Sequence, residues 1–396
     1  MPCLNEAETL ASCIRMAQQG LQQAGVAGEI LIADNGSTDG SQSIAESLNA
    51  RVVAIQQKGY GEALRGGIEA ALGDYIIMAD SDESYDFTKI APFIEKLQAG
   101  HDLVVGCRMP WGGGKVLPGA MPWKHFWIGN PALTFLGKIF FRTRLNDFHS
   151  GLRGFRRKAI LDLHLRTTGM EFATEMIMQA VLSNLSLAEV PITLHPDGRS
   201  RPPHLRSWRD GWRHLRFMLL FAPAWIFILP AGLGLLGGLL GITLIFFKEI
   251  NLADARLTIG TQVVTLFLFL FSYMALTSGF LAKLYGKTTG LLIPRDRIFL
   301  RLLALFSLER GLFIGICIMA GGISIFIKSI WIWSQAGFRN IPMEPNIQNL
   351  LLAMILIAVG FNTLLTSFLA GIISLPLVKP PRGLLQPSED EQVINP

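Results

Sequence analysis

The pattern of apolar and polar residues divides the chain into two unlike parts. Up to residue 216, short apolar runs alternate with longer stretches of mixed polarity. Beyond that point lie four long runs without Asp, Glu, Lys or Arg, at 217–247, 257–282, 311–327 and 345–378. A helix needs about 20 apolar residues to cross the ~30 Å hydrocarbon layer of a bilayer. The pattern therefore predicts a domain of four transmembrane helices at 223–378, followed by a tail at 379–396.

The first part of the chain predicts a different architecture. Short β-branched apolar runs, typical of strands buried on both faces, occur at 29–34, 51–55, 74–80 and 102–107. Stretches with helical patterning alternate with them, at 6–23, 41–48, 61–72 and 89–99. This alternation is typical of an α/β domain with a mostly parallel sheet, which we place at residues 1–197.

A basic amphipathic segment, predicted at 198–222, connects the two parts. Leu205, Trp208, Trp212 and Leu215 repeat at helical spacing. One acid, Asp210, lies among six arginines: Arg199, Arg201, Arg206, Arg209, Arg213 and Arg216. Because this segment directly precedes an apolar run, the pattern favours contact with phosphate or anionic lipid over nucleic acid, and predicts a helix at the membrane surface. An ordinary amphipathic helix packed on the α/β domain is the alternative.

Composition and cysteine usage exclude several classes of protein. Charged residues make up 16% of the chain, hydrophobic residues 50%, and the mean hydropathy is +0.39. A soluble protein typically has about 25% charged residues, so an ordinary soluble two-domain enzyme is excluded. The four cysteines have no CxxC spacing or neighbouring histidines, which argues against a disulfide framework or a cysteine metal site.

The distribution of basic residues between the apolar runs predicts the orientation in the membrane. The connection at 283–310 carries six Lys or Arg residues, whereas those at 248–256 and 328–344 carry two each. Basic loops stay in the cytosol, so the middle loop is predicted to be inside. With four spans, the α/β domain and the C-terminus then also lie in the cytosol, as expected for a multi-pass protein of the plasma (inner) membrane.

Charged side chains follow three of the predicted strands directly. These residues are Asp34, Asp80 with Asp82, and Arg108. Ligands bind at the carboxyl ends of strands in parallel sheets, so these side chains predict one site. Two carboxylates on a turn suit Mg²⁺ or Mn²⁺, which share such oxygens with substrate phosphates. A solvated turn is the alternative for Asp80 and Asp82, and simple strand-to-helix turn chemistry is the alternative for Asp34.

Seven short motifs together resemble the family 2 glycosyltransferases of GT-A fold. They are PCLNEAETL (2–10), ADNGSTDG (33–40), KGYGEAL (58–64), ADSDESYD (79–86), GCR (106–108), SGLRGFRR (150–157) and GRSR (198–201). Their order resembles that of the dolichyl-phosphate mannose or glucose synthases and the bacterial polyprenyl-phosphate glycosyltransferases. The resemblance covers residues 1–216 and implies a GT-A, Rossmann-like domain.

The resemblance also implies roles for individual residues on the donor side of the site. Asp80 and Asp82 would hold the metal, Mg²⁺ or Mn²⁺, although Ser84 stands where some relatives have a further ligand, Gln. The residues implied to bind the nucleotide sugar are Pro2, Glu6, Asp34, Arg199 and Arg201.

On the acceptor side, Arg108 and Lys124 are implied to bind a lipid phosphate, and Arg153 flanks the site. Asp82, Arg108 and Arg153 are thus the expected catalytic residues. Relatives have an apolar strand before the first motif, whereas this chain begins at Met1 and Pro2, so we expect the first strand to be missing and the nucleotide pocket to be poorly supported.

The implied reaction transfers a hexose, glucose or mannose, from a nucleotide-diphosphate sugar to a polyprenyl phosphate at the bilayer, with inversion. The acceptor phosphate is already an anion at pH 7, so no strong general base is needed. A transferase acting on a lipid hydroxyl, for which Glu175 is a candidate base, remains an alternative. So do a polysaccharide synthase, although the chain lacks a QxxRW motif, and a non-catalytic sugar-nucleotide-binding or flippase component. The oligomeric state stays open.

Overall fold

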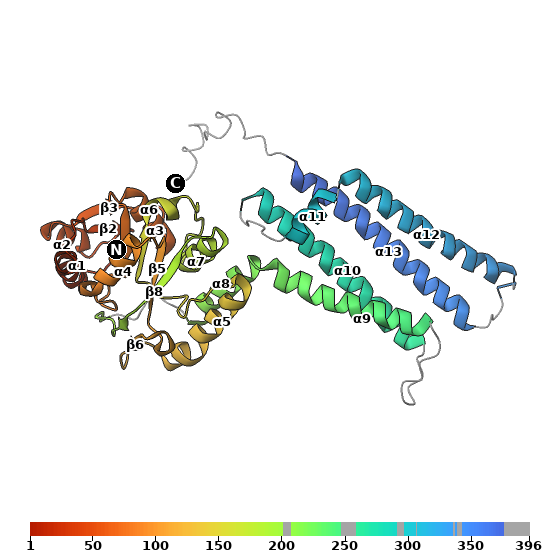
Figure 1. Ribbon diagram of the computed structural model, residues 1–396, viewed down its shortest axis with the longest axis horizontal. Coiled ribbons are helices and arrows are strands. Elements are labelled where there is room, and N and C mark those ends of the chain that lie inside the picture. The colour runs from red at the N-terminus through yellow and green to blue at the C-terminus, as the bar shows by residue number, and fades with distance from the viewer. Residues whose placement is uncertain are drawn as a thin grey trace, which may run out of the picture. The chain divides into compact units, whose positions relative to one another are not determined.

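The computed structural model describes residues 1–200, 207–246, 259–290, 297–305, 307–335, 337–338 and 343–375 (Figure 1). The chain forms two compact units, Met1–Trp225 and Ile226–Pro396, which we call the N-terminal unit and the helical unit. Three residues of the predicted basic segment, Arg201, Leu205 and Arg206, lie outside the described part of the chain. The predicted tail at 379–396 lies outside it as well.

A first sheet of the N-terminal unit is parallel and has the order β1-β2-β3. Its strands are β1 (Pro2–Cys3), β2 (Leu31–Asp34) and β3 (Arg51–Ala54), and its helices are α1 (Leu10–Ala24), α2 (Ser41–Ser47) and α3 (Tyr60–Ala70). Helix α1 buries Leu10, Cys13, Ile14 and Ala17, which lie on one face at the spacing of helical turns. The first motif forms strand β1, whose two residues pair with Ala33 and Asp34, and the expectation of a missing preceding strand stays a prediction.

A second sheet has the order β4-β7-β5-β8. Its strands are β4 (Tyr75–Met78), β7 (Arg153–Arg156), β5 (Leu103–Cys107) and β8 (Leu187–Pro191). Strand β7 runs antiparallel to both neighbours, whereas β5 and β8 are parallel. The helices of this region are η1 (Phe87–Lys89), α4 (Ala91–Gln98), α6 (Arg157–Leu161) and α7 (Phe172–Leu182). The predicted α/β fold with a mostly parallel sheet is confirmed.

Between β5 and β7 the chain makes an excursion, residues 109–146. It contains η2 (Pro110–Gly112), β6 (Lys115–Val116), the π-helical turn η3 (His125–Gly129) and α5 (Asn130–Phe141). Strand β6 pairs in parallel with β9 (Thr193–Leu194). Helix α5 contacts α8 (Ser207–Leu220), which lies within the predicted basic segment.

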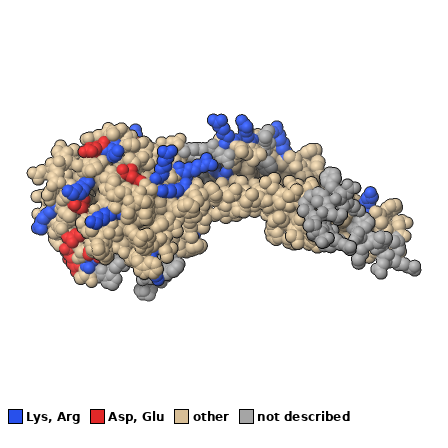
Figure 2. Space-filling view, turned by 60° about the horizontal axis from the view of Figure 1, so that its bottom comes forward, with Lys and Arg blue, Asp and Glu red and all other residues tan. Residues whose placement is uncertain are grey.

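The helical unit contains α9 (Leu229–Phe246), which follows the π-helical turn η4 (Ala224–Ile228), and α10 (Ile259–Thr288), α11 (Arg297–Leu305), α12 (Leu308–Gln335) and α13 (Met343–Ser374). Among the residues that the structure describes, four helices are long and apolar enough to cross a membrane, at Ala224–Thr243, Gly260–Thr288, Leu308–Gln335 and Asn346–Ser374. Figure 2 shows that much of the surface of this unit carries no charged side chains.

Helices α12 and α13 approach closely where both carry glycine. A Cβ on Gly360 would lie 2.7 Å from the backbone nitrogen of Met319, and one on Gly322 would lie 2.9 Å from the Ala353 carbonyl oxygen. Small residues at such contacts are typical of helix pairs in membranes. The predicted membrane domain of four apolar helices is confirmed in architecture.

Candidate active site

The turn after β4 holds both aspartates of the predicted metal site. The Ser81 hydroxyl donates to the Pro2 carbonyl (2.9 Å), and the Thr9 hydroxyl donates to the Ser81 carbonyl (2.6 Å). These bonds fix the turn to the first motif of the chain. The Tyr60 hydroxyl donates to Asp80 Oδ1 (2.9 Å), and the backbone N–H of Ser84 donates to Asp82 Oδ1 (3.1 Å).

Arg199 joins residues that are far apart in the sequence. Its Nε donates to Glu6 Oε2 and its Nη2 to Asp82 Oδ2, both at 2.9 Å. The backbone N–H of Gly198 also donates to the Asp82 carbonyl at 3.0 Å. The structure therefore brings together three of the predicted donor-side residues. Burial opposes the positive charge of Arg199, but Asp82 and Glu6 outweigh it and raise its pKa.

The chemistry of Asp80 and Asp82 suits a divalent cation. Burial and the neighbouring charge of Asp82 raise the pKa of Asp80 to about 6. A divalent cation bound beside Asp80 would favour the ionised form of this carboxyl group. The guanidinium of Arg199 already rests on Asp82 as a cation would. Among the described residues, no group of three or more His, Cys, Asp or Glu side chains forms a metal site. Asp80 and Asp82 would thus supply only part of a coordination shell, as is usual for cations that also bind water and substrate phosphates.

Asp34 ends β2 and holds the turn that follows it. Its carboxylate accepts hydrogen bonds from the backbone N–H of Gly36 (3.1 Å) and Ser37 (3.2 Å) and from Gln42 Nε2 (2.6 Å). Burial alone would raise its pKa, but these hydrogen bonds outweigh burial and lower it. This is the strand-to-helix turn chemistry that the sequence offered as the alternative. A role of Asp34 in nucleotide binding stays a prediction.

Arg108 and Asp147 form a buried ion pair at the end of β5. Arg108 Nε donates to Asp147 Oδ2 (2.6 Å) and Nη2 to Oδ1 (2.8 Å), while the side chains are 9% and 0% exposed. Burial opposes the charge of Arg108, but Asp147 outweighs it and raises the pKa of Arg108. Glu189 of β8 then accepts from the backbone N–H groups of Asn146 (2.5 Å) and Asp147 (3.0 Å).

Sequence reasoning did not assign Asp147, Glu189 or Tyr60 a role. Glu189 is an acid inside the apolar run LAEVP, and that contrast is the signal that could have singled it out. Asp147 lies next to the SGLRGFRR motif, but its pairing with Arg108 spans 39 residues, and no local pattern predicts it.

Arg153 is fully buried in β7, and backbone carbonyls occupy its guanidinium. Nε donates to Ser150 (2.9 Å), Nη2 to Phe148 (3.2 Å) and Nη1 to Ala173. Burial lowers its pKa to about 10. These contacts suit a residue that positions the loop before β7 rather than one that touches substrate. Lys124 is exposed on the excursion, and its Nζ lies 5.9 Å from the ring centroid of Trp123.

His149 and Glu175 are two further buried groups near this loop. Both ring nitrogens of His149 are shielded from solvent and have no hydrogen-bond partner among the described residues. Its ring lies 5.0 Å from that of His214, and burial, followed by the charge of His214, lowers its pKa well below the usual value. Glu175 accepts from the N–H groups of Arg166 (3.0 Å) and Thr167 (2.9 Å) and from the Thr167 hydroxyl (2.7 Å).

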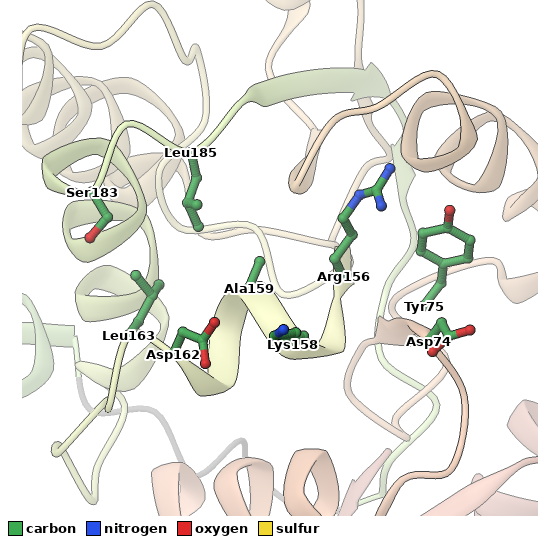
Figure 3. Close-up of a pocket in the computed structure, with 9 residues that line it drawn as sticks. All are labelled: Asp74, Tyr75, Arg156, Lys158, Ala159, Asp162, Leu163, Ser183 and Leu185. Atoms are coloured by element: carbon green, nitrogen blue, oxygen red, sulfur yellow. The ribbon is translucent and has the colours of Figure 1, made fainter.

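A cavity of about 520 Å³ lies elsewhere in the unit (Figure 3). It is lined by Asp74, Tyr75, Arg156, Lys158, Ala159, Asp162, Leu163, Ser183 and Leu185. Asp74 and Tyr75 stand at the start of β4, whereas Asp80 and Asp82 follow its end. None of the predicted site residues lines this cavity, so we assign the candidate site to the charged groups at the strand ends.

Two family models match separate parts of the chain. Residues 1–163 match the family model "Glycosyl transferase family 2", and residues 280–374 match "Glycosyltransferase family 2 C-terminal transmembrane region".

The relatives include two proteins from Haloferax volcanii. The low-salt glycan biosynthesis hexosyltransferase Agl6 is 34% identical over 374 residues, which are 94% of this chain and 87% of the relative. The glycosyltransferase AglJ is 31% identical over 211 residues, 53% of this chain and 66% of that protein. Among solved structures, glucosyl-3-phosphoglycerate synthase from Mycobacterium tuberculosis, in complex with Mn²⁺, UDP and glucosyl-3-phosphoglycerate, matches with a TM-score of 0.43 and 22% identity, over 55% of this chain and 76% of that one.

Proposed function

The chain belongs to glycosyl transferase family 2, and we propose that it transfers a hexose, glucose or mannose, from a nucleotide-diphosphate sugar to a polyprenyl phosphate such as undecaprenyl or dolichyl phosphate. We further propose that the reaction inverts the anomeric carbon and depends on Mg²⁺ or Mn²⁺. The relative named as a hexosyltransferase supports the class of sugar. The four apolar helices and the family's transmembrane region support a membrane-borne acceptor.

The orientation of Arg108 carries the proposal for the acceptor. Its hydrogen bonds to Asp147 use Nε and Nη2, and no described residue accepts from Nη1, so those donors can bind another anion. Arginine held in this way is suited to bind phosphate oxygens. A Cβ placed on Gly151 would lie 2.9 Å from Asp80 Oδ2 and 3.1 Å from the Tyr85 hydroxyl, so Asp80 and Tyr85 border the same point. Burial raises the pKa of Tyr85, and the positive charge of Arg108 opposes that rise. This interaction supports one continuous site.

Catalysis in this proposal relies on positioning and electrostatics. Asp80 and Asp82 would hold the divalent cation, which when bound would neutralise charge on the leaving diphosphate. Arg199, already placed over Asp82 and Glu6, would contact the donor diphosphate, and Arg201 would act with it. Arg108 would hold the acceptor phosphate so that its oxygen attacks the anomeric carbon as the bond to the diphosphate breaks.

The candidate base for a hydroxyl acceptor is already engaged. Glu175 accepts hydrogen bonds from Arg166 and Thr167, and the residue is 1% exposed. A carboxylate in that setting stabilises a loop and is poorly placed to deprotonate a substrate hydroxyl. This favours an acceptor that is already ionised. We also propose the plasma (inner) membrane as the location, with the N-terminal unit and the C-terminus in the cytosol, because the basic residues concentrate in the 283–310 connection.

The test is transfer of labelled sugar from a panel of UDP- and GDP-sugars to undecaprenyl phosphate. The full chain would be compared in membranes with Asp82→Ala, each with and without EDTA. We expect an acid-labile lipid product that EDTA and the substitution both abolish. Product that persists in EDTA would contradict the metal, and product that persists in Asp82→Ala would contradict the assigned site.

A further inference from the structure

The excursion at 109–146 exposes an unusual number of large apolar side chains for a protein surface. Trp123, Trp127 and Phe135 are 63%, 67% and 62% exposed, and Trp111 and Ile128 are exposed as well. Phe126 links two of these side chains: its ring centroid lies 6.4 Å from that of Trp111, in a tilted arrangement, and 4.9 Å from that of Trp127, edge to face. Contiguous exposed apolar groups of this kind mark contact surfaces.

Helix α5 is apolar on its exposed face as well as its buried one. It buries Thr134, Gly137 and Phe141, and its exposed side still carries Phe135, with Lys138 as its charged residue. An exposed helix face that is also apolar is typical of contact with a protein core or with lipid. With 12 residues it is about 18 Å long at 1.5 Å per residue, too short to cross a bilayer. A helix of this kind fits a position along the membrane surface.

The charge of the excursion is entirely positive. Residues 109–145 contain no Asp or Glu, and their basic residues are Lys115, Lys124, Lys138, Arg142 and Arg144. All of these except Lys138 are exposed. Basic side chains interleaved with tryptophan complement anionic headgroups, because tryptophan prefers the boundary between headgroups and hydrocarbon.

The excursion contacts the end of the N-terminal unit. The ring of Phe140 on α5 lies 5.9 Å from that of Trp225, which belongs to the first turn of the Ala224–Thr243 span. The side chain of Met218 on α8 covers Gly137 of α5, since a Cβ there would lie 3.2 Å from the Met218 methyl group. The exposed aromatic residues thus belong to an element that contacts α8 and Trp225, the last residue of the N-terminal unit.

An ion pair between Arg108, the proposed acceptor-binding residue, and Asp147 joins the two ends of the excursion. Arg108 immediately precedes it and Asp147 immediately follows it, and both side chains are buried. Inside the loop, Lys138 Nζ donates to Asn146 Oδ1 at 2.9 Å, which ties α5 to the same base. The position of the aromatic surface is therefore fixed relative to Arg108.

We propose that the excursion, residues 109–146, forms a docking loop whose exposed aromatic side chains enter the headgroup layer of an anionic bilayer. Two observations favour a bilayer as the occupant: α5 contacts Trp225, which directly precedes the apolar run of the helical unit in the sequence, and the charge of the excursion is uniformly positive. Docking would hold Arg108 at the level of lipid phosphates, and this consequence rests on the proposed function. The contact with lipid itself does not depend on it.

Photo-crosslinking of the full chain tests the docking loop. Benzoylphenylalanine would replace Trp127 or Phe135, and the protein would be irradiated in vesicles of phosphatidylethanolamine and phosphatidylglycerol. Leu72 is the matched control, because it is an apolar residue of the same unit, 79% exposed, outside the excursion. Trp123 provides a further position should one variant fail to fold. Adducts would be identified by mass spectrometry.

We expect several-fold more lipid adduct at positions 127 and 135 than at 72. Equal yields at all three positions would overturn the proposal, and so would adducts with a second copy of the chain, which would make the surface a protein interface. The crosslink needs no turnover, so its failure is distinguishable from failure of the transferase reaction.

Discussion

Removal of Asp147 should destabilise the N-terminal unit strongly. Asp147→Ala leaves the buried Arg108 without its counter-charge and deprives two backbone N–H groups, of Arg108 and His149, of their acceptor. Breaking a buried ion pair in this way costs about 3–5 kcal/mol. For a unit of this size, 1 kcal/mol lowers Tm by about 2–4 °C, so the expected loss is roughly 6–20 °C.

The matched control is a surface ion pair in the same unit. Arg51 and Glu29 are 2.8 Å apart with side chains 39% and 28% exposed. Exposed pairs contribute about 0–1 kcal/mol, so Glu29→Ala should lower Tm by no more than about 4 °C. Both variants remove the carboxylate of an arginine pair and an acceptor for backbone N–H groups, but only Asp147 is fully buried.

Buried thiols offer a direct assay on the full chain. Cys3, Cys13 and Cys107 are buried in the N-terminal unit, whereas Cys317 is exposed in α12. In a Cys317→Ser background, a thiol-reactive dye therefore reports unfolding of the N-terminal unit during heating. A Tm for Asp147→Ala no lower than that for Glu29→Ala would refute the reasoning. Arg108→Met combined with Asp147→Leu should recover much of the stability and still lack transfer activity, since apolar replacement of both partners is often tolerated.

Two further predictions concern His149 and Arg199. Folding lowers the pKa of His149, so the stability it contributes is present above its unfolded pKa of about 6.5 and is lost as the pH falls below that value. His149→Phe should therefore flatten the fall in Tm between pH 7 and pH 5, and an unchanged slope would count against this assignment. Arg199→Gln removes the cation from Asp82, so Mn²⁺ alone should bind more tightly, measured by calorimetry, while the KM for the donor rises. Weaker Mn²⁺ binding in this variant would show that Arg199 does not compete for that carboxylate.

The strands and the apolar helices were predictable because their signal is local. The runs at 51–55 and 102–107 became β3 and β5 within one residue, since buried strands are continuous apolar runs. Strand β7 escaped prediction because its sequence, RGFR, has low β-propensity, and its place between β4 and β5 comes from tertiary pairing.

The site was predictable in residue type more than in contacts. Asp82 and Glu6 were both expected near the donor, but their shared partner Arg199 lies 193 residues from Glu6 in the sequence. The contacts of Arg153 were not predictable from its motif. An arginine in such a motif suggests contact with an anion, whereas the guanidinium of Arg153 donates to backbone carbonyl groups. The helix at α5 was not predicted, since an apolar run that short fits a strand, a core helix or an interfacial segment equally well.

The most direct test of the central claim compares two acceptors that differ only in the phosphate. Purified full chain with Mn²⁺ and its preferred sugar nucleotide would be given undecaprenyl phosphate or undecaprenol, and the labelled lipid product would be quantified. We expect product from undecaprenyl phosphate alone, and we expect Arg108→Gln to abolish it. Product from undecaprenol at a comparable rate would contradict this expectation, because the acceptor would then be a hydroxyl group that needs a general base.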